Sequence, residues 1–227
     1  TGDVSGNDSD NPGDAGDVSG NDISAGDVSE GNILPVSVAK EAVRVEMNGE
    51  SLDFSTWEKA VAYVNQKGSR KTETHIYLQQ DVESSVKTLV FPKYPLTLHG
   101  NGYTLHFAGT TVSLPADTVL KNVQLETSAK GGFNLNASGS LTMDGVNEKT
   151  VPEGSYGIKA VRGAVSKNLT YLDKNVENPI TGFGTVCFGA DTEVSAVLAL
   201  KKVQVAAGKT LRLQNTFKAD EIRLGEK

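Results

Sequence analysis

Tyrosine and histidine are the residues of this chain whose types and positions best suit a binding site. Exposed tyrosine rings beside asparagine and glutamine can stack on sugar rings and hydrogen-bond to sugar hydroxyl groups. The candidate ligand-binding residues are Tyr77, Tyr94, Tyr156, Tyr171, His99 and His106. Tyr103 has the same strand parity as Leu105, so we expect its ring to point inward and leave it out of this set.

The histidines raise the question of a metal site. His99 and His106 stand on either side of a Gly-Asn-Gly turn, and strand alternation points both outward, so the two imidazoles could approach each other. Zinc sites use at least three protein ligands, and the sequence offers no third ligand for this pair. We therefore expect no metal ion or cofactor in this region.

The chain has one cysteine, Cys187, so no intrachain disulfide can form. It alternates with Val186 and Phe188 in an apolar stretch. This pattern predicts a buried, inert thiol rather than a nucleophile.

The acidic residues do not suggest catalysis. A glycosidase needs two carboxylates about 5–9.5 Å apart across the scissile bond, and a calcium-dependent lyase needs several Asp near a basic residue. The acids of the strand-rich region tend to fall at strand ends, where Asp is an ordinary turn former: Asp81, Asp117, Asp144, Asp191 and Asp220. We expect no catalytic residue among them.

Charge and hydropathy exclude two classes of partner. The net charge of the 227-residue chain is −6, and residues 1–32 carry eight acids with no Lys or Arg. The remainder is nearly neutral and has no clustered basic face for a phosphate backbone, so we expect no nucleic-acid binding. No apolar run reaches 18 residues, so we expect no membrane insertion. The chain has neither an initiator Met nor a signal sequence, and we expect it to be a monomeric piece of a longer protein.

Residues 1–32 are predicted to form a flexible acidic linker, followed by one domain over residues 33–227. The motif GDVSGND occurs at residues 2–8 and again at 16–22, with a variant at 26–32. Gly, Asp, Ser and Asn bury too little apolar surface to offset backbone ordering. A weak calcium site is the alternative, but the spacing fits neither an EF-hand nor the calcium-binding nonapeptide.

One amphipathic helix is predicted, at about residues 55–67. Ser55 and Glu58 fit a capping box, and Gly68 is placed to end the helix. Its apolar stripe consists of Trp57, Ala60, Val61 and Val64. We expect this stripe to cover the open end of a solenoid, with Trp57 in the core rather than stacked on a sugar.

Short strands dominate the rest of the domain. Residues 33–47 alternate loosely and are followed by an Asn-Gly turn signal, and the stretch from residue 75 to the end contains repeated period-two segments. Leu78, Leu98, Leu120 and Leu141 are spaced by 20, 22 and 21 residues, and Val112 and Leu135 by 23. Spacing near 21 predicts an all-β parallel β-helix in which these leucines stack as a buried column.

Several segments together resemble a known group. They are TWEKAVAYVN, THIYLQQDV, PLTLHGNGYTLHF, LKNVQL and GSLTMDG. In this order they are similar to the pectate-lyase-like right-handed β-helix repeats of large Gram-positive surface proteins and adhesins. The similarity covers residues 51–143 well and the rest loosely. It implies a right-handed β-helix with a capping helix, in an extracellular, cell-wall-attached protein.

Three functions are compatible with these sequence features. The first is a non-catalytic β-helical module, an adhesin or stalk, that binds glycan or a host protein on a lateral face. The second is a polysaccharide lyase or hydrolase, because such enzymes share this fold. The third is a mechanical spacer without a ligand.

Overall fold

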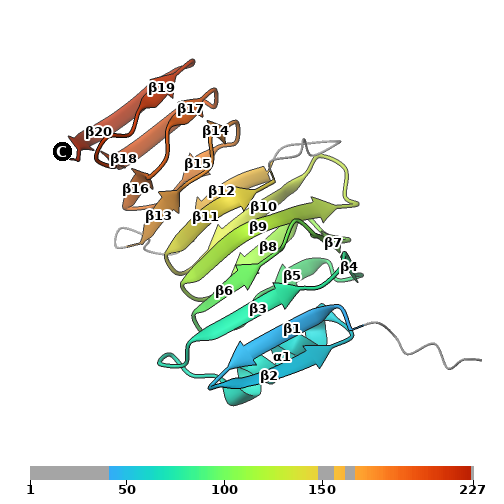
Figure 1. The fold of residues 1–227 in the computed structure, drawn as a ribbon. Helices are drawn as coiled ribbons and strands as arrows, with labels where there is room; N and C mark the ends of the chain where they lie inside the picture. The colour runs from blue at the N-terminus through green and yellow to red at the C-terminus, as the bar shows by residue number, and fades with distance from the viewer. Residues whose placement is uncertain (1–40, 148–155, 162–166, 226–227) are drawn as a thin grey trace, which may run out of the picture. The chain divides into compact units, whose positions relative to one another are not determined.

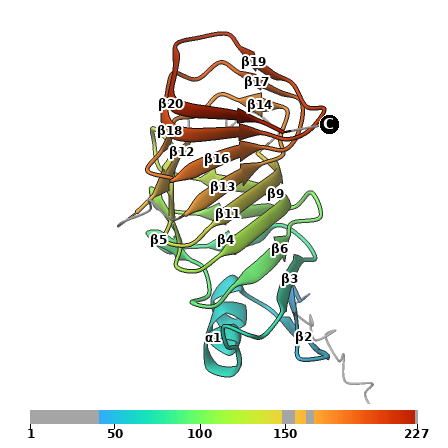
Figure 2. The same ribbon diagram turned by 90° about the vertical axis from the view of Figure 1, so that its left-hand side faces the viewer.

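The computed structural model describes residues 41–147, 156–161 and 167–225. All of them belong to one compact unit, Ala39–Lys227. They are mostly parallel β-strands wound into a solenoid of about 6 turns, here called coils, with one helix (Figures 1 and 2). The predicted parallel β-helix is confirmed. The predicted linker at residues 1–32 and the segment 33–40 lie outside the described residues.

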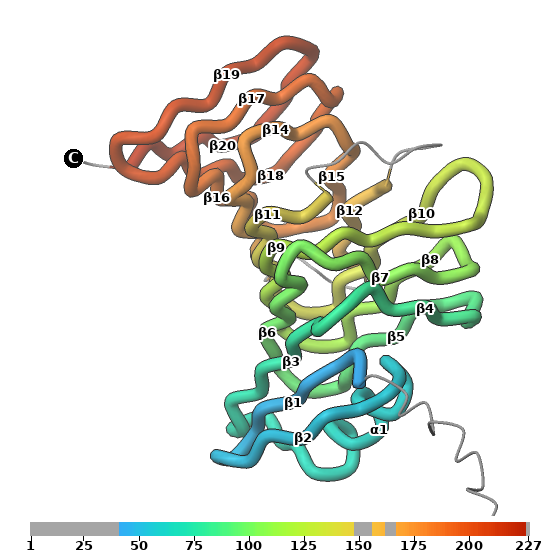
Figure 3. The backbone as a smooth tube through the Cα atoms, turned by 45° about the vertical axis from the view of Figure 1, so that its right-hand side comes forward, coloured from blue at the N-terminus to red at the C-terminus, as the bar shows by residue number. Residues whose placement is uncertain are grey.

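The strands form three sheets, and Figure 3 follows the chain from one coil to the next. The first sheet contains, in spatial order, β2 (Glu50–Phe54), β1 (Val43–Met47), β3 (Thr74–Leu78), β6 (Leu96–His99), β9 (Thr118–Thr127), β11 (Leu141–Val146), β13 (Asn168–Tyr171), β16 (Thr185–Phe188), β18 (Leu198–Val205) and β20 (Phe217–Leu224). Strands β4 (Val82–Ser84) and β7 (Thr104–Phe107) join this sheet beside β9. The second sheet contains β15 (Ile180–Thr181), β12 (Tyr156–Ala160), β10 (Phe133–Ala137), β8 (Thr111–Leu114) and β5 (Thr88–Val90). The third contains β14 (Asn175–Val176), β17 (Thr192–Val194) and β19 (Leu211–Leu213).

The buried column of the first sheet differs from the predicted one. Leu98 pairs with Leu120 as predicted, but Ile76 and Met143 complete the column on either side. Leu78 and Leu141 lie two residues away along their strands. A shift of two residues keeps a side chain on the same face, so all four leucines are buried although they do not form one stack. The prediction was wrong because the coils are not equal in length.

The second sheet contains the column that the sequence indicated through Val112 and Leu135. These residues pair in register, as predicted, and the stack continues to Leu89 on one side and Ile158 on the other. All four side chains are fully or almost fully buried. Each contributes about 1.5–3 kcal/mol through burial, so the core is a set of apolar columns between the sheets.

The amino-terminal end of the solenoid is an antiparallel hairpin. Strands β1 and β2 are joined at Asn48 and Gly49, whose φ angles are 55° and 79°. Positive φ at both positions is typical of a type I′ hairpin turn, and the predicted turn is confirmed. Strand β1 also pairs antiparallel with β3, whereas the later strands pair in parallel.

Helix α1 (Trp57–Lys67) packs against β1, β2 and β4 at this end. Its N-cap is Thr56, which accepts a hydrogen bond from the backbone N–H of Lys59 at 3.3 Å, so the predicted Ser55–Glu58 capping box is wrong. Glu58 instead accepts a hydrogen bond from Ser84 of β4. The backbone N–H of Gly68 donates to Val64 and ends the helix, as predicted.

Trp57 of this helix lies in the core, as expected from its place on the apolar stripe. Its ring centroid is 4.8 Å from that of Phe91, and its Nε1 donates to the carbonyl of Val90 at 3.2 Å. The indole is therefore closed to a ligand.

Three other expectations fail on this part of the chain. The apolar stretch 194–200 has the pattern of one strand, but it turns a corner between β17 and β18. Cys187 is half-buried rather than buried, because it faces away from the core between the buried Val186 and Phe188. Burial raises the pKa of its thiol. Tyr156, expected at the end of a loop, begins β12.

The last coil leaves apolar side chains uncovered. Leu213, Ile222 and Leu224 are 48%, 55% and 75% exposed, while Val205, the residue below Leu224 in the same column, is buried. Strand β20 pairs only with β18 within the described residues. The two ends of the stack therefore differ: a hairpin and a helix cover one, and the other presents an open strand edge.

Candidate functional site

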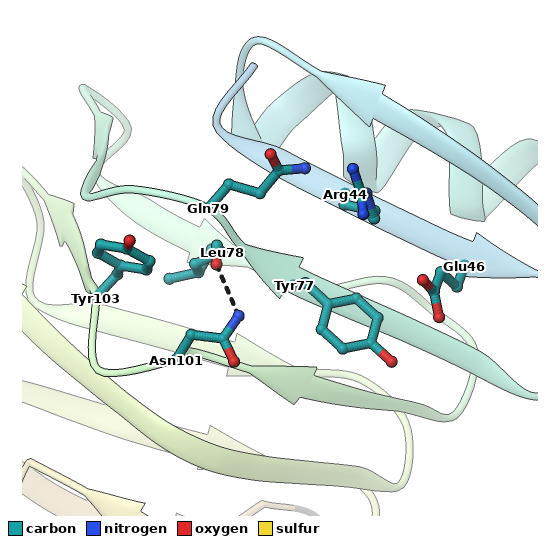
Figure 4. A pocket seen from close by; sticks show the side chains of 7 residues that line it. All are labelled: Arg44, Glu46, Tyr77, Leu78, Gln79, Asn101 and Tyr103. Carbon is teal, nitrogen blue, oxygen red and sulfur yellow. Dashed lines mark hydrogen bonds between the residues drawn. The ribbon is translucent and has the colours of Figure 1, made fainter. Parts of the chain in front are cut away.

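A surface pocket of about 480 Å³ lies on the outer face of the first sheet, near its amino-terminal end. We call it the N-terminal pocket. It is lined by Arg44, Glu46, Tyr77, Leu78, Gln79, Asn101 and Tyr103 (Figure 4). The residues come from β1, from β3 and the residue after it, and from the turn between β6 and β7.

Strand alternation and register bring the first part of this lining together. Ile76 and Leu78 of β3 point into the core, so Tyr77 points outward. The antiparallel pairing with β1 sets Arg44 directly opposite Tyr77. Segments 31 or more residues apart therefore present their side chains on one face.

The Gly-Asn-Gly turn supplies the rest. Asn101 and Gly102 have positive φ angles of 55° and 82°, and the Asn101 amide donates to the carbonyl of Leu78 at 3.0 Å. Both β6 and β7 pair with β9, so the turn bends the chain within one coil and does not form a hairpin. The bend sets Tyr103 at the rim of the pocket, 38% exposed. The expectation that Tyr103 points inward is wrong, because it lies in the bend, before β7 begins.

Charges at one side of the pocket are already paired. Arg44 Nε lies 2.9 Å from Asp53 Oδ1, and the Gln79 amide also donates to Asp53. The hydrogen bond from Arg44 holds the pKa of Asp53 below its usual value. The pocket therefore presents hydrogen-bonding groups without a free cationic centre at Arg44.

Tyr77 is held from two sides. Its ring stacks on His99 of the next coil, with centroids 4.4 Å apart and an interplanar angle of 10°. Partial burial raises the pKa of the Tyr77 hydroxyl, and a hydrogen bond with Glu46 raises it further. The phenol therefore stays neutral and can donate a hydrogen bond at physiological pH.

His99 does not meet His106, as the sequence had suggested it could. Its partner is His75 of β3, with His75 Nδ1 and His99 Nε2 3.1 Å apart. Partial burial and the neighbouring His75 lower the pKa of His99.

His106 lies in a different surface pocket, of about 570 Å³, which we call the His106 pocket. Its Nδ1 is 3.1 Å from Glu126 of β9, and its Nε2 is 3.9 Å from Glu83 of β4. The two carboxylates thus face different nitrogens of one ring. Among the residues that the structure describes, no three His, Cys, Asp or Glu side chains are grouped to hold a metal ion.

The four predicted tyrosines have different surroundings. Tyr77 lines the N-terminal pocket, whereas Tyr94 lies outside it, half-buried, with Lys93 Nζ 5.2 Å from its ring. Tyr156 and Tyr171 are only 3% and 2% exposed. Both lie in core columns, and burial strongly raises the pKa of each hydroxyl. Neither can present a ring face to a ligand, so the assumption that they are exposed is wrong.

Three of the five predicted turn acids join adjacent coils. Asp81, Asp117 and Asp191 each precede a strand and accept a hydrogen bond from a backbone N–H of the next coil, at 2.7–2.8 Å. Their structural role is the one that the sequence predicted. Asp144 and Asp220 instead lie within β11 and β20, so their placement at strand ends is wrong.

Sequence reasoning missed most of the pocket. His75, Arg44, Glu46, Gln79 and Asn101 were not among the candidates. The available signal was the alternation of His75, Tyr77 and Gln79 on one side of β3. The antiparallel register that adds β1 carried no comparable signal.

Two further observations bound the interpretation. Within the described ranges, no helix is long and apolar enough to cross a membrane. No protein-family model, no curated protein and no solved structure matches this chain.

Proposed function

We propose that this chain is a non-catalytic β-helical module of a bacterial surface protein that binds carbohydrate in the N-terminal pocket. The observation that carries the proposal is the lining of this pocket, where the rings of Tyr77 and Tyr103 flank the amide of Asn101 (Figure 4). Aromatic rings and amides are the groups with which proteins contact the apolar and polar faces of sugars.

The charges of the pocket favour a neutral sugar. The Arg44 guanidinium is paired with Asp53, so it offers little attraction to an anionic ligand. Glu46 adds a carboxylate to the lining. Sugar hydroxyl groups both donate and accept hydrogen bonds, which suits the amides of Gln79 and Asn101.

The setting at a bacterial surface rests on the resemblance of residues 51–143 to β-helical repeats of Gram-positive surface proteins. A stack of coils with a continuous apolar core is a rigid support for a lateral binding face. An adhesin or a stalk is the role that combines such a support with a shallow binding site.

The His106 pocket supplies the observation that favours the alternative, a polysaccharide lyase or hydrolase. Glu83 and Glu126 lie on either side of His106, and enzymes of this kind use paired carboxylates. The imidazole, however, occupies the space between the two acids. A scissile bond cannot lie there, so we favour the binding module.

A panel of neutral and acidic oligosaccharides, incubated with the protein with and without calcium, tests the proposal. We expect saturable binding of a neutral oligosaccharide and no cleavage product by chromatography. Tyr103→Ala should weaken binding about tenfold or more, because stacking on one ring is worth about 1–3 kcal/mol. Tyr94→Ala is the matched control, since Tyr94 lies outside the pocket.

Two outcomes would contradict the proposal. Cleavage products that disappear in Glu126→Gln would favour the enzyme. The absence of saturable binding across the panel would favour the mechanical spacer.

A further inference from the structure

Two imidazoles from successive coils converge outside the N-terminal pocket. His75 of β3 lies opposite Thr97, and His99 of β6 lies opposite Tyr77, so the two histidines are diagonal neighbours on the outer face of the first sheet. Their ring centroids are 5.3 Å apart, and His75 Nδ1 is 3.1 Å from His99 Nε2. Two nitrogens therefore face each other.

Glu73 determines which nitrogen of His75 carries the proton. Its Oε1 lies 3.1 Å from His75 Nε2. An ionised carboxylate can only accept, so this hydrogen bond requires a proton on Nε2 and leaves Nδ1 of the neutral ring with a free lone pair directed at His99. A carboxylate that binds the far nitrogen of an imidazole is also the arrangement that orients histidine ligands in metal sites.

We propose that His75 and His99 bind a divalent transition-metal ion, through His75 Nδ1 and His99 Nε2. Zinc–nitrogen bonds of about 2.0–2.1 Å at a tetrahedral angle place two ligand nitrogens about 3.3 Å apart. The observed separation of 3.1 Å is close to that value, so the pair needs only a small adjustment to accept an ion.

Proton balance is simple. In the metal-free pair, His99 Nε2–H donates to His75 Nδ1. On metal binding, the proton on His99 Nε2 is lost to water and Nδ1 of the same ring takes one up, so His99 stays neutral. No net proton is released.

The chemistry of the donors selects the ion. Imidazole nitrogen suits Zn²⁺, Ni²⁺ and Cu²⁺, whereas Ca²⁺ and Mg²⁺ require oxygen ligands. Glu46, directly opposite His75 in the register, adds negative charge on the same face, and Lys121, opposite His99, adds positive charge. With two protein ligands, the ion keeps open positions for water or for an oxygen of a bound molecule.

The other clusters do not support a comparable site. The carboxylates around His106 face different ring nitrogens, so one ion cannot be held by all three groups. His106 therefore serves as a control residue for metal binding.

Isothermal titration calorimetry of the untagged full chain with zinc chloride tests the proposal. We expect a binding isotherm with one site that calcium chloride does not compete for. His75→Gln and His99→Gln should each weaken that site at least about tenfold, and Glu73→Gln should do so by about tenfold through loss of orientation. His106→Gln should leave the isotherm unchanged.

Circular dichroism of each variant controls for folding, and nitrogen NMR shifts of both rings give an independent readout. Zinc should shift His75 Nδ1 and His99 Nε2 and leave the His106 nitrogens unchanged. Equal zinc binding by the wild type and the His75→Gln/His99→Gln double variant would overturn the proposal, because binding would then lie elsewhere, for example in residues 1–32. The absence of zinc binding by the wild type would overturn it as well.

Discussion

The ring of Tyr77 lies flat against the ring of His99 on the next coil, 4.4 Å away. This contact is possible because the two residues are direct partners in a parallel register, on the outer face. It sets the edge of the N-terminal pocket and links the pocket to the His75–His99 pair. A single register thus positions both the proposed carbohydrate site and the proposed metal site.

Truncating a residue in the first buried column should destabilise the whole domain. Leu98 is completely buried between Ile76 and Leu120. We expect Leu98→Ala to lower the free energy of unfolding by about 2–5 kcal/mol, through lost burial and a residual cavity. Urea denaturation followed by circular dichroism measures the change.

The control for that experiment is Val197→Ala, because Val197 is 63% exposed at the corner between β17 and β18. Its effect should be within about 0.5 kcal/mol. Equal effects of the two substitutions would contradict the stacked-column description of the core.

Gly100 should not tolerate a side chain. A Cβ atom at this position would lie 2.4 Å from the backbone of Asn122 and from Val123 Cα, so backbone would have to move. We expect Gly100→Ala to cost about 3 kcal/mol or more in stability, measured by thermal and urea unfolding. The substitution should also displace Tyr103 from the rim of the pocket.

Gly131→Ala is the comparison for Gly100→Ala. Gly131 has a φ of 86° but open space around its Cβ position, so its substitution should cost only the backbone strain, about 1–2 kcal/mol. A larger loss for Gly131→Ala than for Gly100→Ala would show that the close approach of the Gly-Asn-Gly turn to β9 is wrong.

The Arg44–Asp53 pair should be visible in acid titrations. The hydrogen bond from Arg44 lowers the folded-state pKa of Asp53 below its ordinary value of 3.8. The pair therefore stabilises the fold above about pH 4, and this contribution is lost as the pH falls through the lowered folded-state pKa. Arg44→Gln should raise the pKa of Asp53 and weaken this dependence.

Carbon-13 NMR of the Asp53 carboxyl group, with and without Arg44→Gln, measures the shift directly. Lys93→Gln is a suitable control, because Lys93 lies at Tyr94 rather than at Asp53. An unchanged Asp53 titration in Arg44→Gln would contradict the assigned pairing.

The sequence predicted the class of fold better than it predicted which residues meet. Period-two segments, the Asn48–Gly49 turn and the apolar stripe of α1 depend on local chemistry, and all three have the expected structure. The spacing of leucines located the core but misassigned its columns, because the coils differ in length. Strand parity is reliable only inside a strand, which is why it failed for Tyr103.

The candidate site was less accessible from sequence for a physical reason. Its lining depends on the antiparallel pairing of β1 with β3, and this long-range register left no mark on the local pattern. The same limitation paired His99 with His106 across a turn, when the fold pairs it with His75.

An NMR titration of ¹⁵N-labelled protein with neutral oligosaccharides tests carbohydrate binding in the N-terminal pocket most directly. We expect saturable shifts of the backbone amides of Gln79, Asn101 and Tyr103, with no change in β12 (Tyr156–Ala160). Shifts confined to the His106 pocket, or no saturable shifts with any oligosaccharide, would contradict binding at this site.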